Sequence, residues 1–252
     1  MTIVSTDQVP SHPAEPLLEV LVLHPRDVAG AHDGGADRIF VVDDPASGGR
    51  SPEPALVSAV CKETDLPVRA MLRLSESWTT TGSELSRLAG LAADYLGCGA
   101  EGVAFGFLDA DLNVDVAVCE RLVEDIGRVP WTFHRAIDAS LETDHAWRAL
   151  RTLPHLDAVL AAGSARGLDA GCDELTDRAA RDPDVSRLLM AGGGLRGEHV
   201  PWLVRAGVHQ FQVASSVRPG ASWKAHVESG HVRAWRMLLD DAADLAAGRP
   251  AG

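Results

Sequence analysis

The chain has 252 residues, of which 46% are hydrophobic and 23% are charged, as in an ordinary globular protein. This length suits one large domain or two small ones, and the composition excludes a disordered or collagen-like chain. Acidic residues number 36 and basic residues 23, which gives a net charge of −13. That charge argues against nucleic acid as a partner, because nucleic acids bind to broad basic surfaces.

Four cysteines are scattered along the chain without a CxxC pair, a pattern typical of reduced thiols in the cytoplasm. The segment 1–16 has neither the basic start nor the apolar run of a signal peptide. The longest nearly apolar stretch, Leu17–Leu23, is too short to cross a bilayer. We therefore expect a cytoplasmic protein without a membrane partner, in which residues 1–16 form a disordered tail.

Short apolar or β-branched runs recur along the chain, each followed by a turn signal and a stretch of helical periodicity. Clear helical patterns are expected at 85–96, 116–126 and 223–247. Strands alternating with helices in this way predict a single-domain (β/α)8 barrel of the TIM type over residues 17–247. The predicted strands are 17–23, 36–42, 67–73, 102–108, 130–135, 157–163, 187–193 and 208–214.

The alternative α/β architecture is a doubly wound open sheet. That fold would be favoured by a GxGxxG turn after the first strand, where this chain reads HPRDVAG. A GxGxxG match does occur at 97–102, but it leads into a predicted strand instead of following one. The barrel is therefore the better prediction.

The carboxyl ends of the predicted strands gather polar residues, where barrel enzymes place their functional groups. Arg73 closes the third strand, and His134 and Arg135 close the fifth. We expect His134 to act as a general acid/base, oriented by the carboxylate of Asp138 in the next loop. Arg73 and Arg135 would then clamp an anion such as a carboxylate or phosphate.

Further candidates lie on or after other strands. Glu19 lies mid-strand among leucines, so it must face the lumen with a partner. We expect Arg73 to be that partner in a structural ion pair; the alternative is that Glu19 is a catalytic group. Gln212 occupies one face of the eighth strand, and Asp109 follows the fourth. Gly193 and Gly194 follow the seventh, where backbone N–H groups can hold a phosphate or simply form a turn.

Several chemistries are excluded by what the sequence lacks. Neither Lys62 nor Lys224 ends a predicted strand, so a Schiff-base aldolase lacks its nucleophile. The motifs of P-loop, nucleophile-elbow and HExxH enzymes do not occur. The run 108–115 lacks the glycine and terminal glutamate of a calcium loop, so an Asx turn is expected. His226 and His231 are expected to be solvated on the last helix.

The runs GADRIFVV, GFLDADLNVD, WTFHRAID and LMAGGGLR, in this order and spacing, resemble the CutC family over nearly all of residues 17–240. Members are usually described as copper homeostasis proteins and have a (β/α)8 barrel. The resemblance implies copper binding or handling, association as dimers, and a polar cluster at the barrel mouth. That cluster would be carried here by Glu19, Arg73, His134, Arg135 and Asp138, with Asp109 nearby.

The chain departs from the family pattern at several positions. Phe40 stands where a glutamate is typical, Ser75 replaces a second arginine, and Gln212 replaces the usual histidine of the eighth strand. Leu21 and Val22 occupy positions where some members carry cysteines. Because copper(I) prefers thiolate and thioether ligands, these departures weaken the case for a copper site.

Three hypotheses remain open. The first is copper handling, for which Cys98 and Cys119 are the only pair of thiols on neighbouring units that could approach one another. The second is an enzyme acting on a small phosphate or carboxylate metabolite through His134. The third is a degenerate barrel that only binds, as the changes at Phe40 and Gln212 would predict. A homodimer would use the segment 223–235 as its contact surface.

Overall fold

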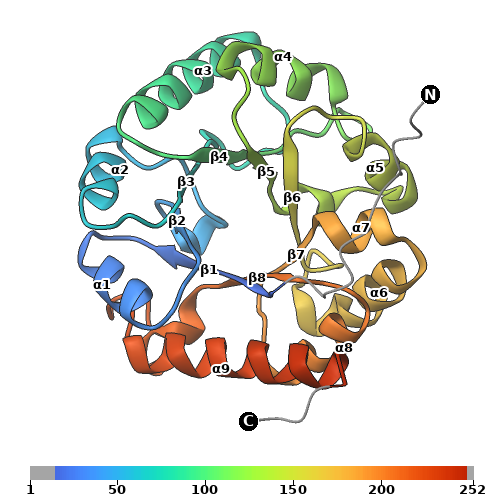
Figure 1. Ribbon diagram of the computed structural model, residues 1–252. Coiled ribbons are helices and arrows are strands. Elements are labelled where there is room, and N and C mark those ends of the chain that lie inside the picture. The colour runs from blue at the N-terminus through green and yellow to red at the C-terminus, as the bar shows by residue number, and fades with distance from the viewer. Residues whose placement is uncertain (1–14, 249–252) are drawn as a thin grey trace, which may run out of the picture.

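The computed structural model describes residues 15–248, and within them eight parallel strands close into one barrel. Each strand pairs with the next along the chain, and β1 pairs with β8, so every strand has two neighbours (Figure 1). This confirms the predicted (β/α)8 architecture. The strands are β1 Leu17–Val22, β2 Arg38–Val41, β3 Val68–Met71, β4 Gly102–Phe105, β5 Trp131–Phe133, β6 Leu156–Ala161, β7 Leu189–Ala191 and β8 Gln210–Val213.

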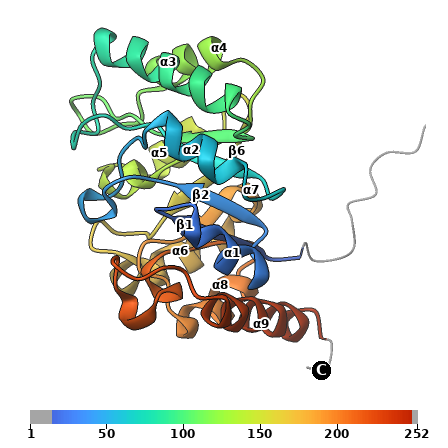
Figure 2. The same ribbon diagram turned by 90° about the vertical axis from the view of Figure 1, so that its left-hand side faces the viewer.

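Helices form a ring outside the strands (Figure 1). The last helix, α9, packs along α1 and α8, and Figure 2 shows it running along the outside of the barrel. The helices are α1 Arg26–Asp33, α2 Pro54–Cys61, α3 Gly82–Gly97, α4 Val116–Ile126, α5 Thr143–Leu150, α6 Leu168–Arg181, α7 Pro183–Leu188, α8 Val200–Arg205 and α9 Ser229–Ala246. Short 3-10 turns are η1 Pro45–Ser47, η2 Arg135–Ala139, η3 Gly197–His199, η4 Ser215–Val217 and η5 Pro219–Ala221.

The alternation of side chains along each strand separates two apolar regions. Ile39 and Val41 of β2 point outward into the main core between the strands and the helices. Phe40 and Val42 belong instead to a smaller cluster inside the barrel, which also contains Leu21, Met71 and Ala104. This inner cluster lies at the carboxyl ends of the strands, so the mouth of the barrel has an apolar wall.

The largest difference from the predicted elements is the start of the last helix. A helix was expected from Trp223, but α9 begins at Ser229. The preceding segment cannot be helical because Asp27 of α1 accepts hydrogen bonds from the backbone of Val227 and lies 3.0 Å from the ring of His226. His226 therefore lies before the helix and not on it, although its side chain is exposed as expected.

Two expectations concern the ends of the chain and membranes. Most of the predicted disordered tail, residues 1–14, lies outside the described residues. Over the described range 15–248, none of the helices combines the length and apolar character that a bilayer crossing requires.

Candidate functional site

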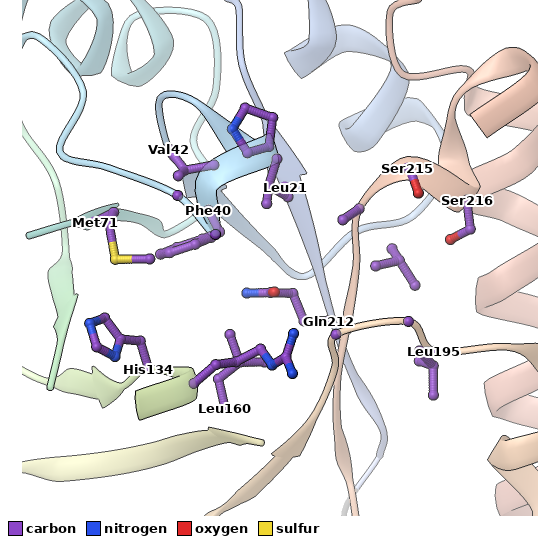
Figure 3. Close-up of a pocket in the computed structure, with 18 of the residues that line it drawn as sticks. Leu21, Phe40, Val42, Met71, His134, Leu160, Leu195, Gln212, Ser215 and Ser216 are labelled. Atoms are coloured by element: carbon purple, nitrogen blue, oxygen red, sulfur yellow. The ribbon is translucent and has the colours of Figure 1, made fainter. Parts of the chain in front are cut away.

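A cavity of about 260 Å3 opens at the carboxyl ends of the strands. Its walls come from the ends of seven strands and from the loops that follow them, β4 being the exception. Figure 3 shows Phe40 and Met71 on one side of the cavity, Ser215 and Ser216 on the other, and Gln212 between them. This is the end of the barrel at which (β/α)8 proteins bind their ligands.

Arg135 is the charged side chain of this cavity, and its guanidinium is held in place from two directions. Its Nε donates to the Asp138 carboxylate at 2.7 Å, and its Nη2 donates to the carbonyl of Ser164 at 3.2 Å. The guanidinium lies directly against Gly193, where a Cβ atom would come within 2.7 Å of it. Among the described residues nothing accepts from Nη1, which leaves that N–H group for a ligand.

The loops after β7 and β8 form the wall near Arg135. Gly193 and Gly194 both have positive φ, 79° and 96°, conformations that glycine adopts without strain. Within residues 15–248, no carbonyl or side chain accepts a hydrogen bond from the backbone N–H groups of Gly193, Gly194, Ser215 or Ser216. These N–H groups and the two serine hydroxyls therefore add uncharged hydrogen-bond donors to the cavity, and Gly193 among them lies against Arg135.

No carboxylate lines this cavity among the described residues, although the chain has 36 acidic residues. The Asp138 carboxylate, which pairs with Arg135, lies behind the wall and also accepts from the backbone N–H groups of Ala162 and Gly163. Burial raises the pKa of Asp138, while Arg135 and these N–H groups act against that rise. The cavity itself is therefore positive in a protein whose net charge is strongly negative.

His134 lines the cavity and is buried. Its Nδ1 accepts a hydrogen bond from the backbone N–H of Ala136, so the proton of the neutral ring lies on Nε2. Burial, with the nearby charge of Arg73, lowers the pKa of His134 to about 3. At neutral pH this imidazole is an uncharged hydrogen-bond donor and a weak base.

The expected contact between Asp138 and His134 is not formed. Asp138 binds Arg135 and the loop after β6, as described above, and His134 instead packs edge-on against the Trp78 ring at 5.4 Å. The reason is the 3-10 turn η2, which begins at Arg135 and brings that residue and Asp138 together at a spacing of three. Asp138 therefore positions the arginine and not the histidine.

Arg73 lies behind the cavity wall and is not one of the described residues that line it. Its Nη1 donates to the carbonyls of Ser47 and Gly49, and its Nη2 donates to that of Glu76. Its guanidinium also lies 4.3 Å from the centre of the Trp78 ring. Arg73 thus ties together the loops after β2 and β3, and burial together with Arg50 lowers its pKa.

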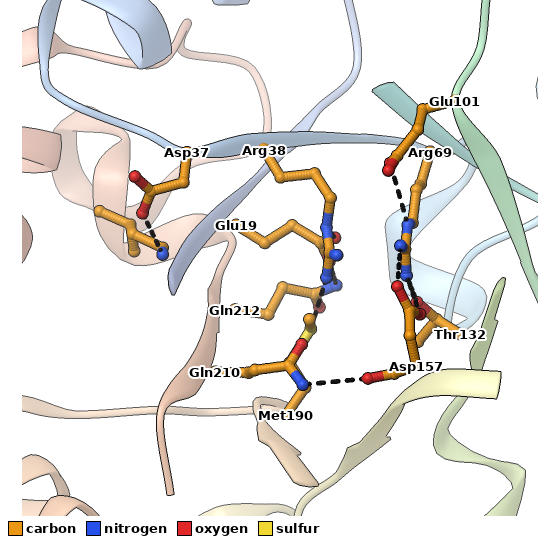
Figure 4. A network of polar contacts seen from close by, with 11 residues as sticks. Glu19, Asp37, Arg38, Arg69, Glu101, Thr132, Asp157, Met190, Gln210 and Gln212 are labelled. Atoms are coloured by element: carbon orange, nitrogen blue, oxygen red, sulfur yellow. Dashed lines mark hydrogen bonds and ion pairs between the residues drawn. The ribbon is translucent and has the colours of Figure 1, made fainter. Parts of the chain in front are cut away.

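Glu19 lies one layer below the cavity and pairs with Arg38, not with Arg73 as expected. Arg38 Nε donates to Glu19 Oε2 at 2.5 Å, because the two residues lie directly opposite each other on β1 and β2 (Figure 4). Gln212 Nε2 donates to the other carboxylate oxygen at 2.6 Å. Gln212 therefore connects this buried ion pair to the cavity above it.

A second buried charge, Arg69, lies near the amino-terminal ends of the strands. Its guanidinium binds Asp157 and Thr132, and Gln210 donates to the backbone carbonyl of Asp157 (Figure 4). These polar groups fill the barrel below the cavity. They lie far from the carboxyl ends of the strands, so they serve the packing of the barrel interior.

Asp109 takes no part in the cavity. Its Oδ1 accepts from the backbone N–H groups of Asp111 and Asn113, which confirms the predicted Asx turn. Asp115 then begins α4 by accepting from the N–H of Val118. Ser75 also follows β3 outside the cavity-lining set of described residues.

The four cysteines lie outside the cavity. Burial raises the pKa of Cys61, and the neighbouring Cys98 thiol raises it further, so Cys98 has Cys61 and not Cys119 as its neighbouring thiol. Cys119 is completely buried, which raises its pKa to about 12. Within the described residues, no three His, Cys, Asp or Glu side chains are placed to hold a metal ion.

Residue order does not reveal every residue of the site. Ser215 and Ser216 directly follow β8, as Gly193 and Gly194 follow β7, so the rule that identifies the glycines also finds the serines. Arg38, in the layer below the cavity, begins its strand and so carries no signal of strand-end function. Trp78 lies mid-loop, where no sequence signal marks it as part of the site.

Comparison with known proteins finds a protein family that matches this chain over all eight strands. The model of the CutC family matches residues 16–217. The family protein CutC of Klebsiella pneumoniae is 28% identical over 214 residues, covering 81% of this chain and 85% of that protein. The corresponding protein of Sodalis glossinidius is 30% identical over 245 residues, covering 91% and 94%.

The fold is also found among solved structures. One is described as the "Putative Copper Homeostasis Protein CutC" of Streptococcus agalactiae. It matches with a TM-score of 0.70 at 19% identity, covering 78% of this chain and 97% of that one. At this identity the likeness shows the shared barrel alone.

Proposed function

Since the chain belongs to the CutC family, whose members share this barrel, we propose that it uses the mouth of the barrel to bind a small metabolite with a phosphate or carboxylate group. One observation carries the proposal: Arg135 is the only charged side chain among the described residues that line the cavity. An isolated positive charge in a partly buried cavity favours an anion, because the attraction is screened there less than in water.

The donors around Arg135 suit the oxygens of such a group. The free Nη1 of Arg135 is rigidly presented, since the other two nitrogens are already bonded. The backbone N–H groups of the loop after β7, with the hydroxyls of Ser215 and Ser216, add uncharged donors. Loops after the seventh and eighth strands hold phosphate groups in many (β/α)8 proteins. A charged hydrogen bond of this kind contributes about 1.5–3 kcal/mol.

The geometry supports binding more strongly than acid–base catalysis. A general base needs a pKa near the working pH. His134 has a pKa of about 3, so it accepts protons poorly at neutral pH. No carboxylate lines the cavity among the described residues, so none is available in its place. The neutral Nε2–H group of His134 can still donate a hydrogen bond to a bound ligand.

Copper handling is the function that the family name implies, and the cavity does not fit a copper(I) centre. Copper(I) favours thiolate and thioether ligands. The cavity offers one thioether, Met71, and one imidazole, His134, whose Nδ1 already accepts a backbone hydrogen bond. No step of the proposed function uses copper.

The proposal is tested by thermal unfolding with increasing inorganic phosphate. Phosphate should raise the melting temperature of the unmutated protein, because a ligand that binds only the folded state stabilises it. Arg135→Ala should abolish the rise, while Arg87→Ala, an exposed arginine on α3, should leave it unchanged. Ser215→Asp should also abolish it, by adding a negative charge to the cavity without disturbing the Arg135–Asp138 pair.

The results separate the hypotheses. An equal rise in all four proteins would show that phosphate acts outside the cavity and would refute the proposal. Copper handling is tested by competing the protein against a copper(I) chelator. Tight stoichiometric binding that is lost in Cys61→Ser/Cys98→Ser would assign the function to those thiols instead of the cavity.

A further inference from the structure

We propose that the ligand's body is a flat apolar ring that carries one hydrogen-bond donor, an O–H or N–H group, which Gln212 accepts. This inference rests on the proposed function, because the anionic group held by Arg135 fixes one end of the ligand. The inference adds the chemical class of the rest of the ligand. The evidence comes from the floor of the cavity and from the wall opposite Arg135.

The orientation of the Gln212 side chain decides which hydrogen-bonding group the floor of the cavity presents. A carboxylate that is paired with an arginine accepts hydrogen bonds and donates none. Glu19 is such a carboxylate, so the amide of Gln212 must turn its Nε2 toward Glu19, as the 2.6 Å contact shows. The amide carbonyl oxygen of Gln212 is then left as an acceptor.

That acceptor has no partner among the described residues, although Gln212 is only 7% exposed. Gln212 also lines the cavity, and Figure 3 places it between the apolar wall and the serines. This oxygen is not fully buried but is reached through the cavity, so a ligand O–H or N–H group can donate to it there. The orientation therefore selects a ligand with a donor in its middle.

Apart from His134, the wall opposite the serines is apolar (Figure 3). Leu21, Phe40, Val42 and Met71 form the inner cluster at the barrel mouth, separate from the main core. Above them the loop after β2 packs closely, since a Cβ atom at Gly49 would lie 2.6 Å from Val42. The apolar side chains of this wall offer no partner to a polar or charged ligand body.

Two aromatic residues give this wall its preference for a ring. Figure 3 shows Phe40 of β2 facing the cavity. Trp78 also lines the cavity, edge-on to the ring of His134. Aromatic side chains pack best with other rings, in offset or edge-on arrangements. The cavity volume of about 260 Å3 lies near the lower limit for ligand pockets, which suits one ring and one anionic group.

The test compares probes that differ by one feature, with binding to the unmutated protein measured by calorimetry. The probes are inorganic phosphate, phenyl phosphate, the ortho, meta and para hydroxyphenyl phosphates, and their methoxy analogues; benzoate and the hydroxybenzoates repeat the series with a carboxylate. Phenyl phosphate should bind at least about tenfold more tightly than inorganic phosphate. One hydroxy isomer should bind about tenfold more tightly again, and its methoxy analogue should not.

Variants at two glutamines then test which residue accepts the hydrogen bond from the ligand. In Gln212→Met, the hydroxy isomer should bind no more tightly than its methoxy analogue. Gln210→Met is the matched control, because Gln210 lies on the same face of β8 but outside the cavity-lining set of described residues. It should preserve the advantage of the hydroxy isomer. If Gln212→Met does not fold, the hydroxy and methoxy probes decide the question without it.

The outcomes distinguish this inference from the proposed function. Binding of inorganic phosphate without any gain from the ring or the hydroxyl group would overturn the inference and leave the proposed function standing. A hydroxyl gain that persists in Gln212→Met would also overturn it. Failure of every phosphate and carboxylate probe to bind would overturn both.

Discussion

Gly193 has no side chain, and this absence gives the Arg135 guanidinium its place in the cavity. A Cβ atom at Gly193 would come within 2.7 Å of the guanidinium carbon. Gly194 has an even larger positive φ, 96°, but the nearest atom to a Cβ there is the backbone nitrogen of Leu168 at 3.8 Å. The two neighbouring glycines therefore share one backbone constraint and differ in their contact with Arg135.

Alanine at each glycine separates these two effects. Gly193→Ala and Gly194→Ala should each lower the free energy of unfolding by about 1–3 kcal/mol, because both place a side chain at positive φ. Only Gly193→Ala should also weaken phosphate binding, by about tenfold or more, because it displaces Arg135. Chemical denaturation and calorimetry measure the two quantities. Equal losses of phosphate affinity in both variants would contradict this account.

His134 should make the stability of the protein depend on pH. Its pKa falls from 6.5 to about 3 on folding, because the buried site near Arg73 opposes the charged ring. Between these values the unfolded chain binds more protons than the folded one. Stability should therefore fall as the pH drops below 6.5, by up to about 1.4 kcal/mol per pH unit from this group.

The measurement compares unfolding at several pH values in the unmutated protein and in His134→Gln. The variant should show a shallower dependence between pH 6.5 and the acid limit, since glutamine does not titrate. His209, whose pKa burial also lowers, contributes a dependence of the same sign that both proteins keep. Identical slopes in the two proteins would show that His134 is not buried in its neutral form.

At the scale of elements, the strands and their order in the barrel could be predicted, and the register between neighbouring strands could not. Seven of the eight strands lie inside predicted apolar runs, β6 begins one residue before its run, and α4 has the predicted bounds 116–126, because period and composition are local signals. The partner of Glu19 depends on the register of β1 against β2, which sets it opposite Arg38. Likewise, the 3-10 turn after β5 turns Asp138 toward Arg135, a rotation that residue order alone does not reveal.

The late start of α9 also has a tertiary cause, the buried carboxylate of Asp27. Asp27 binds Arg218 through both oxygens and accepts from the backbone of Leu23 and Val227. It thereby holds the segment after β8 against α1. Although burial alone would raise the pKa of Asp27, Arg218 and the backbone N–H groups outweigh it and lower the pKa.

Removing the negative charge of Asp27 should strongly destabilise the folded protein. Asp27→Asn should lower the free energy of unfolding by about 3–5 kcal/mol, because it leaves Arg218 buried without its partner. Asp33→Asn, at an exposed position of the same helix, should change it by less than about 0.5 kcal/mol. Denaturant titration measures both. A small effect of Asp27→Asn would mean that Arg218 finds another acceptor.

At the scale of the whole molecule, the barrel interior is divided into an open apolar mouth and a polar lower half. Glu19, Arg38 and Gln212 form the layer directly below the cavity, and the Arg69–Asp157 pair lies further toward the strand starts. Buried ion pairs contribute little net stability compared with apolar packing of the same volume. Their value here is orientation, since Glu19 fixes the amide of Gln212.

A double-mutant cycle tests whether the Glu19–Arg38 pair contributes net stability to the folded protein. Glu19→Leu alone should cost about 3–5 kcal/mol by leaving Arg38 unpaired, whereas Glu19→Leu/Arg38→Met should recover most of that loss. The single variant Arg38→Met completes the cycle, with unfolding free energies taken from denaturant titration. Additive losses in the double variant would show that the two side chains act independently.

Two indole rings, Trp78 and Trp223, line the cavity from different loops, while Trp131 and Trp147 are fully buried. Indole emission responds to the polarity and quenching groups around the ring. A molecule entering the mouth of the barrel would replace water beside two of these fluorophores and leave the buried ones untouched. The protein therefore carries an intrinsic optical reporter of occupancy, and replacing Trp78 or Trp223 by phenylalanine would show which ring supplies the signal.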